Sequence, residues 1–141
     1  MDSGEKLTRS RLDPVFLEIP AKLVSEANQR GHWRRKYQRG KQQKDAVVCA
    51  WLAAGRPTMA PPVRVLITRI GPKTMDSDNL AGSAKAVRDA IAEKVLGTDD
   101  GSPLILWEYA QRRPLKQKKE KYGCEVEVVP WSGWRLDEES K

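Results

Sequence analysis

Short runs of apolar residues, many of them β-branched, predict four strands. Residues 63–70 give the clearest pattern, because proline precedes the run, glycine follows it and valine and isoleucine dominate it. Residues 15–19 form a shorter apolar run that ends at a proline. Residues 104–109 are also apolar, and residues 122–128 alternate between apolar and polar or glycine positions, which is typical of a half-buried strand.

Two further segments have apolar residues at helical spacing. Residues 42–54 repeat alanine, valine and tryptophan every three or four positions and end before Gly55. Residues 80–95 have the same periodicity and end near Gly97. The order strand, helix, strand, helix, strand, strand predicts an α/β or α+β fold, in which two main helices flank a small mixed β-sheet.

The length of 141 residues fits one domain. We expect a flexible N-terminal arm at residues 1–13, the folded domain at 14–130 and a polar C-terminal tail at 131–141. The polar N-terminus and the absence of a long apolar run predict a cytoplasmic protein with no membrane partner. Cys49 and Cys124 lie in apolar periodic stretches without a partner spacing, so we expect reduced thiols in the core.

The chain is strongly basic, with a formal net charge of +7 and a pI of about 9.6. This balance favours a polyanionic partner such as nucleic acid. Residues 28–44 contain no acid and interleave Trp33 and Tyr37 with lysines and arginines, a combination suited to phosphates and unpaired bases. A second basic run at residues 112–121 is more typical of a solvated surface. The candidate DNA-binding side chains are Arg30, Arg34, Arg35, Lys36, Arg39, Lys41 and Lys73.

Three aspartates are candidate ligands for a metal ion. Asp76 and Asp78 stand two residues apart between a predicted strand and a predicted helix, and in an extended segment such residues point the same way. Asp100 precedes the next predicted strand. Magnesium prefers hard oxygen ligands of this kind. Acids at these places are equally typical of a helix N-cap and of a turn, so the spacing alone leaves both interpretations open.

Other site chemistries are disfavoured by the sequence. The single histidine, His32, stands among basic residues, which argues against a zinc site or a histidine-based triad. No Walker A or GxGxxG motif follows a predicted strand. Ala81 and Val87 stand where a calcium-binding EF-hand loop would need glycine and glutamate.

The segment Asp76-Ser77-Asp78-Asn79-Leu80, followed by Lys85, Asp89 and the pair Asp99-Asp100, resembles the RusA family of Holliday junction resolvases. The resemblance extends less sharply over most of the chain, outside the N-terminal arm and the C-terminal tail. It implies a RusA-like fold, a homodimer and an endonuclease that uses magnesium, with manganese as the alternative ion, to cleave four-way DNA junctions in recombination and repair.

The resemblance also implies roles for individual residues. Asp76, Asp78 and Asp100 would be metal ligands, and together with Lys85 they would be the catalytic residues. Asn28 would be a further DNA-binding residue. Two other functions remain open at this point: a non-catalytic nucleic-acid-binding module, and a nuclease for other branched DNA such as forks or flaps.

The sequence departs from the family pattern in two places. Lys85 stands about three residues farther from the aspartate motif than in the family, through an extension at residues 81–83. Either the helix begins later, with Ser83 as its N-cap, or the chain makes an additional turn. The family's N-terminal loop is rich in proline and asparagine, and residues 21–27 replace it here. We therefore expect the selectivity for junctions to differ from that of the family.

Overall fold

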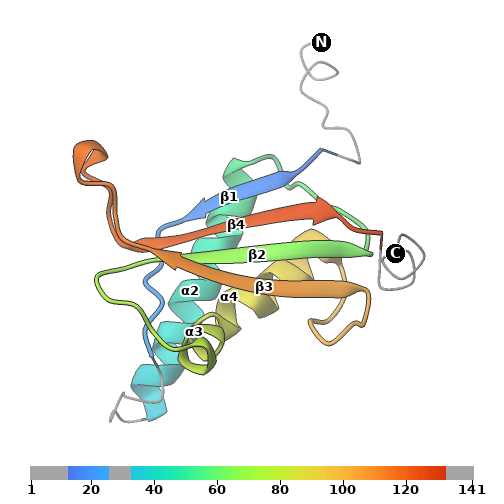
Figure 1. Ribbon diagram of the computed structural model, residues 1–141. Helices are drawn as coiled ribbons and strands as arrows, with labels where there is room; N and C mark the ends of the chain where they lie inside the picture. Colours follow the sequence, from blue (N-terminus) through green and yellow to red (C-terminus); the bar gives the residue numbers. More distant parts are fainter. Residues whose placement is uncertain (1–12, 26–32, 133–141) are drawn as a thin grey trace.

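A computed structural model describes residues 13–25 and 33–132 of the chain (Figure 1). Two of the predicted DNA-binding residues, Asn28 and Arg30, lie outside the described residues. Most of the predicted N-terminal arm and C-terminal tail lies outside them as well.

In the described part of the chain, the strands form one four-stranded mixed sheet. The strands are β1 (Val15–Ile19), β2 (Val63–Ile70), β3 (Ile105–Arg112) and β4 (Gly123–Pro130), and their order in the sheet is β1-β4-β2-β3. β2 runs parallel to β3, whereas β4 pairs antiparallel with both β1 and β2. The parallel pair requires a crossover connection, which is supplied by the helices between β2 and β3.

The alternating pattern of the strands places one apolar row against the helices. In β1, Leu17 is buried whereas Phe16 is 54% exposed. Leu17 and Ile67 both pair with Val126 of β4, so these three buried side chains form a row across the sheet. Figure 1 shows all labelled helices on one side of the sheet. The core therefore lies between this face and the helices, and no helix within residues 13–25 and 33–132 covers the opposite face of the sheet.

The helices of this layer come from two parts of the chain. α2 (Trp33–Ala53) lies between β1 and β2, and α3 (Ser77–Ser83) and α4 (Lys85–Ile91) follow β2. α4 continues into a π-helical turn (Ala92–Leu96), which ends at Gly97 with a left-handed backbone. The predicted order of elements and the α+β class with a mixed sheet are thus confirmed, with the second helix divided into segments. No helix in the described ranges is long and apolar enough to cross a membrane.

The predicted start of the first helix was wrong. We expected it near residue 42, where apolar periodicity begins, but α2 already begins at Trp33. Only Gln43 and Val47 of this helix are buried, so its first turns extend beyond the core and carry no apolar stripe. Arginine, lysine and glutamine have high intrinsic helix propensity, which allows these turns to be helical without such a stripe.

The prediction that both cysteines are core thiols was half right. Cys124 is buried in β4, and burial raises the pKa of its thiol to about 12. Cys49 is exposed on α2. The buried side of α2 runs through Gln43 and Val47, and a residue two positions after Val47 points away from that side. Both thiols are free, as expected.

Candidate metal and nucleic-acid site

The loop between β2 and α3 is fixed to the sheet by two polar side chains. The buried Arg69 of β2 donates from Nε to the carbonyl of Leu23 at 3.0 Å and from a second nitrogen to the carbonyl of Lys73. Gln111 of β3 pairs with the backbone of Met75 in both directions, at 2.9 and 2.8 Å. The sheet thus sets the position of the chain immediately before the first candidate metal ligand.

Asp76 is the N-cap of α3. One of its carboxylate oxygens accepts a hydrogen bond from the backbone N–H of Asn79 at 2.8 Å, and the other accepts from the Asn79 side chain at 3.2 Å. Asp78 lies in the first turn of α3 and is exposed, and its carboxylate has no partner among the described residues. The capping interpretation is therefore confirmed for Asp76. Capping leaves acceptor positions on the carboxylate, because an ionised carboxylate has about four lone-pair sites.

The extension at residues 81–83 forms the last turn of a separate short helix. The chain leaves α3 at Ala84, which has φ −95° and ψ 3°, and Lys85 begins α4. Of the two expected explanations, the additional turn is correct. Ser83 is not the N-cap of α4: it is buried, and its hydroxyl donates to the carbonyl of Leu80 at 2.7 Å.

Lys85 lies between two carboxylates. Its Nζ is 3.2 Å from Oδ1 of Asp89, one turn later on α4, and 3.7 Å from Oδ2 of Asp100. The hydrogen bond with Asp89, together with both negative charges, raises the pKa of Lys85. The ammonium group is mostly exposed and remains charged at neutral pH, so it is available to an anion that approaches from solvent.

Asp100 is held by a group of side chains that the sequence did not single out. Nε of Arg88 lies 2.8 Å from its Oδ2, and its carbonyl accepts from Arg88 at 3.1 Å and from the indole of Trp107 at 3.0 Å. Arg88 also lies 4.8 Å from the centre of the Trp107 ring and donates to the hydroxyl of Tyr109 at 2.9 Å. Burial alone would raise the pKa of Asp100, but the charges of Lys85 and Arg88 outweigh it and the pKa is lowered.

The three candidate metal ligands do not form one compact group. Within residues 13–25 and 33–132, no three histidine, cysteine, aspartate or glutamate side chains lie close enough together to hold a metal ion. Asp76 and Asp78 share the start of α3, whereas Asp100 contacts Arg88 and Lys85. The donor chemistry fits magnesium, because all three supply carboxylate oxygens. An ion that bound Asp100 would have to compete with its two cationic neighbours.

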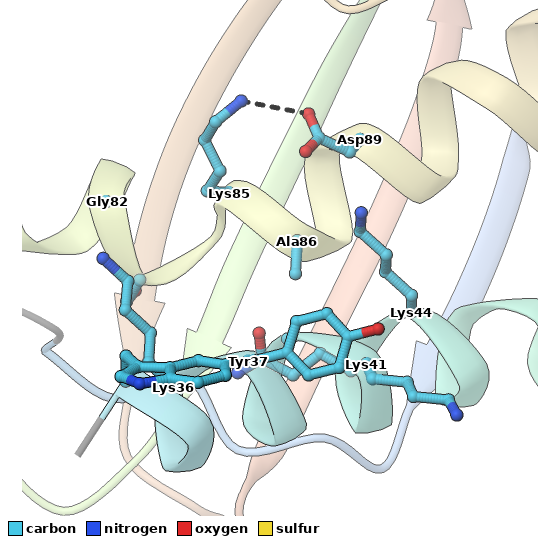
Figure 2. Close-up of a pocket in the computed structure, with 12 residues that line it drawn as sticks. Lys36, Tyr37, Lys41, Lys44, Gly82, Lys85, Ala86 and Asp89 are labelled. Atoms are coloured by element: carbon cyan, nitrogen blue, oxygen red, sulfur yellow. Dashed lines mark hydrogen bonds and ion pairs between the residues drawn. The ribbon is translucent and has the colours of Figure 1, made fainter. Parts of the chain in front are cut away.

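A groove lies beside Lys85, between α2 and α4 (Figure 2). Its volume is about 780 Å³. Lysines and aromatic side chains come from the α2 side, whereas small residues and the pair Lys85–Asp89 come from the α3–α4 side. The residues that line it are Trp33, Lys36, Tyr37, Gly40, Lys41, Gln43, Lys44, Gly82, Ser83, Lys85, Ala86 and Asp89.

The predicted DNA-binding residues divide into two groups. Lys36 and Lys41 line the groove, as does Lys44. Arg34, Arg35 and Arg39 are also on α2 but do not line it, and Lys73 is exposed in the loop before α3. The structure thus brings part of the basic α2 segment next to Lys85, which the sequence alone did not predict.

Arg88, Trp107 and Tyr109 are the contacts that sequence reasoning missed. A signal existed for Arg88, since it stands three positions after Lys85 and therefore lies close to it along one side of the helix. The two aromatic side chains are on β3, and no local pattern connects them to Arg88. Comparisons of the chain with protein-family models and with curated proteins gave no match.

Proposed function

We propose that the protein is a magnesium-dependent endonuclease that cleaves branched DNA, with the four-way junction of recombination and repair as its substrate. The observation that supports this most is the position of Lys85. It lies next to the carboxylates of Asp89 and Asp100, and it also lines the groove whose α2 side carries lysines and aromatic rings. A candidate ligand for a hard cation, Asp100, thus lies close to a surface suited to nucleic acid.

In this proposal Asp76, Asp78 and Asp100 hold the magnesium ion. When bound, the ion supplies positive charge against the scissile phosphate and lowers the pKa of a water molecule. Lys85 contributes a second positive charge, because its ammonium group stays protonated beside Asp89. It would stabilise negative charge on the phosphate as the bond to the leaving oxygen breaks.

The basic residues of α2 would bring DNA to this acidic site. Lys36, Lys41 and Lys44 lie across the groove from Lys85 and would neutralise phosphates. The net charge of +7 draws a polyanion towards the protein despite the local aspartates. Binding should therefore weaken steeply as the salt concentration rises.

We further propose that the protein acts as a homodimer. A four-way junction has approximate two-fold symmetry, and a two-fold symmetric dimer would place one site on each of two opposed strands. Such a dimer would introduce paired, symmetric cuts. A monomer would instead cut one strand at a time.

The test is cleavage of a labelled immobile four-way junction, compared with a linear duplex of the same arm sequence, in magnesium and in EDTA. Paired cuts in the junction that require magnesium would support the proposal. Equal cutting of the duplex would contradict the proposed selectivity. Replication-fork and flap substrates in the same series would identify a nuclease with a different branched substrate.

A second candidate function is a nucleic-acid-binding module without catalysis. Two observations favour it: Asp76 caps α3, and Asp100 is paired with Arg88. In this case the aspartates only stabilise the fold. The junction would then be bound in a salt-dependent manner, with no cleavage in magnesium or manganese.

A further inference from the structure

We propose that the groove between α2 and α4 binds one unpaired nucleotide of the DNA substrate, with the ring of Tyr37 stacked on its base. The inference rests on the proposed function only for the class of substrate, DNA with an unpaired base. It does not require that the protein cleaves DNA, because no metal ligand proposed above lines the groove.

The groove offers an aromatic face next to open space. Tyr37 is 67% exposed although it lines the groove, so much of its ring is accessible. Figure 2 shows the ring on α2, with the methyl group of Ala86 pointing from α4 towards α2. On the α3–α4 side the lining residues Gly82, Ser83 and Ala86 are small. A Cβ atom built at Gly82 would meet no atom within 4 Å. A flat base can stack on an exposed ring of this kind, and such stacking tolerates any base.

The charges around the groove fit the sugar-phosphate backbone of that nucleotide. Lys36, Lys41 and Lys44 line it from α2, and Lys85 lines it from α4. Among the described residues that line it, the only acid is Asp89, and its Oδ1 lies 3.2 Å from Nζ of Lys85. The groove is therefore lined by positive charges and by aromatic rings, which suits a nucleotide better than an uncharged peptide.

The base must be unpaired for a physical reason. Both faces of a base inside a duplex are already stacked on neighbouring base pairs, so they cannot contact Tyr37. A base at a branch point or in a single strand can leave its stack at a lower cost. Since the groove borders Lys85, a nucleotide held there would place its backbone beside the proposed catalytic lysine.

The test uses 2-aminopurine, a fluorescent base whose emission changes when it stacks. It is placed at an unpaired position of a branched DNA and, for comparison, at a paired position of a linear duplex. Binding is measured in EDTA, so that neither cleavage nor metal binding affects the result. The wild-type protein should change the emission of the unpaired base. Tyr37→Ala should abolish this change and weaken binding of the unpaired DNA about tenfold, whereas Tyr37→Phe should keep both.

Two further comparisons separate stacking from general effects. Phe16→Ala removes another exposed aromatic ring, 54% accessible against 67% for Tyr37, from β1 outside the groove, and should leave both signals unchanged. Gly82→Glu adds a negative charge where there is room for a side chain, and should weaken binding of unpaired DNA more than Gly82→Gln does. A Tyr37→Ala protein that bound unpaired DNA like wild type, or that lost duplex and unpaired DNA equally, would overturn the proposal.

The cleavage test and the fluorescence test can fail independently. If the protein shows a Tyr37-dependent fluorescence change but does not cleave DNA, the proposed nucleotide site is supported and the proposed nuclease function is contradicted. If the protein cleaves junctions but shows no Tyr37-dependent fluorescence change, the nuclease function is supported and the proposal that the groove holds the base is overturned. Loss of dimerisation in Tyr37→Ala, with normal fluorescence, would assign the groove to a second copy of the chain and overturn the proposal.

Discussion

Nε of Arg88 lies 2.8 Å from the carboxylate Oδ2 of Asp100, so a candidate metal ligand already has a cationic neighbour in the fold. The same arginine contacts the carbonyl of Asp100 and two aromatic side chains of β3. It therefore links α4, the loop before β3 and β3 itself. If Asp100 binds magnesium, Arg88 both fixes the loop and competes with the ion for the carboxylate.

Replacing Arg88 by methionine tests this double role. We expect Arg88→Met to lower the free energy of unfolding by about 1–3 kcal/mol, because part-buried hydrogen bonds to Tyr109 and to the Asp100 carbonyl are lost. The pKa of Asp100 should rise, since one of the charges that lowers it is removed. Magnesium, measured by calorimetry, should bind more tightly.

Arg64→Met is the matched control for that experiment. Arg64 pairs with Glu108 at 2.9 Å, but both side chains are 40% exposed or more, so the loss should be below about 1 kcal/mol. Chemical denaturation of both variants checks the comparison. Equal stability losses in the two variants would contradict the structural role given to Arg88.

Substituting alanine for Gly71 and for Gly82 should change the stability of the fold in opposite directions. A Cβ atom at Gly71 would lie 2.6 Å from the buried guanidinium of Arg69, which is fixed by two carbonyls. We expect Gly71→Ala to cost about 1–3 kcal/mol and to loosen the loop before Asp76. At Gly82 a Cβ meets no atom within 4 Å, so Gly82→Ala should stabilise the helix by up to about 1 kcal/mol. Thermal melts of both variants distinguish the two outcomes, and a stabilising Gly71→Ala would refute the packing argument.

The loop between β3 and β4 should be sensitive to acid. Hydrogen bonds from Arg112, together with the backbone N–H of Leu115, lower the pKa of Glu120 to about 2. A carboxylate with a lowered pKa stabilises the fold above its unfolded pKa, and this contribution is lost as the pH falls through the folded value. The protection of the loop amides against exchange, measured relative to their intrinsic exchange rates at each pH, should therefore fall between about pH 4.5 and pH 2.

Glu120→Gln provides the comparison for the acid effect. It should lower the protection of the loop amides at neutral pH and remove most of its pH dependence. Replacing the exposed Glu127 of β4 by glutamine should leave the exchange profile of the loop unchanged. A profile in Glu120→Gln that still followed the wild-type pH dependence would rule out Glu120 as the titrating group.

Lys85→Ala should separate catalysis from folding. The side chain is 68% exposed, so its removal should change the free energy of unfolding by less than about 1 kcal/mol. Junction cleavage should slow by about 100-fold or more, which is typical for loss of one group that stabilises charge in the transition state. Single-turnover cleavage rates check this, and a rate within twofold of wild type would contradict the role proposed for Lys85.

The fold was predictable wherever the apolar pattern is set by burial. β2 was predicted with its observed bounds, because Val63, Val65 and Ile67 all point into the core and proline and glycine bound the strand. The first turns of α2 were not predicted, because they lack a buried face. Apolar residues recur at helical spacing where a helix packs on a core. A helical segment that projects from the core lacks this pattern.

The site was predictable only in its local part. The N-cap of Asp76 depends on residues within one turn, and the sequence indicated it. The contact of Arg88 with Trp107 and Tyr109 depends on the crossover that lays α4 against β3, and the groove beside Lys85 depends on how α2 packs on α4. Both are set by tertiary packing, for which the chain carries no local signal.

The most direct test of the central claim is junction cleavage by Asp78→Asn. Asp78 is exposed and its carboxylate has no partner among the described residues, so this nearly isosteric change should leave the fold intact. Asp45→Asn, an exposed acid on α2 that does not line the groove, is the control. We predict that Asp78→Asn binds the four-way junction as well as or better than wild type but does not cut it in magnesium, whereas Asp45→Asn cuts normally. Cleavage by Asp78→Asn at the wild-type rate would contradict the assignment of the aspartates to a metal site.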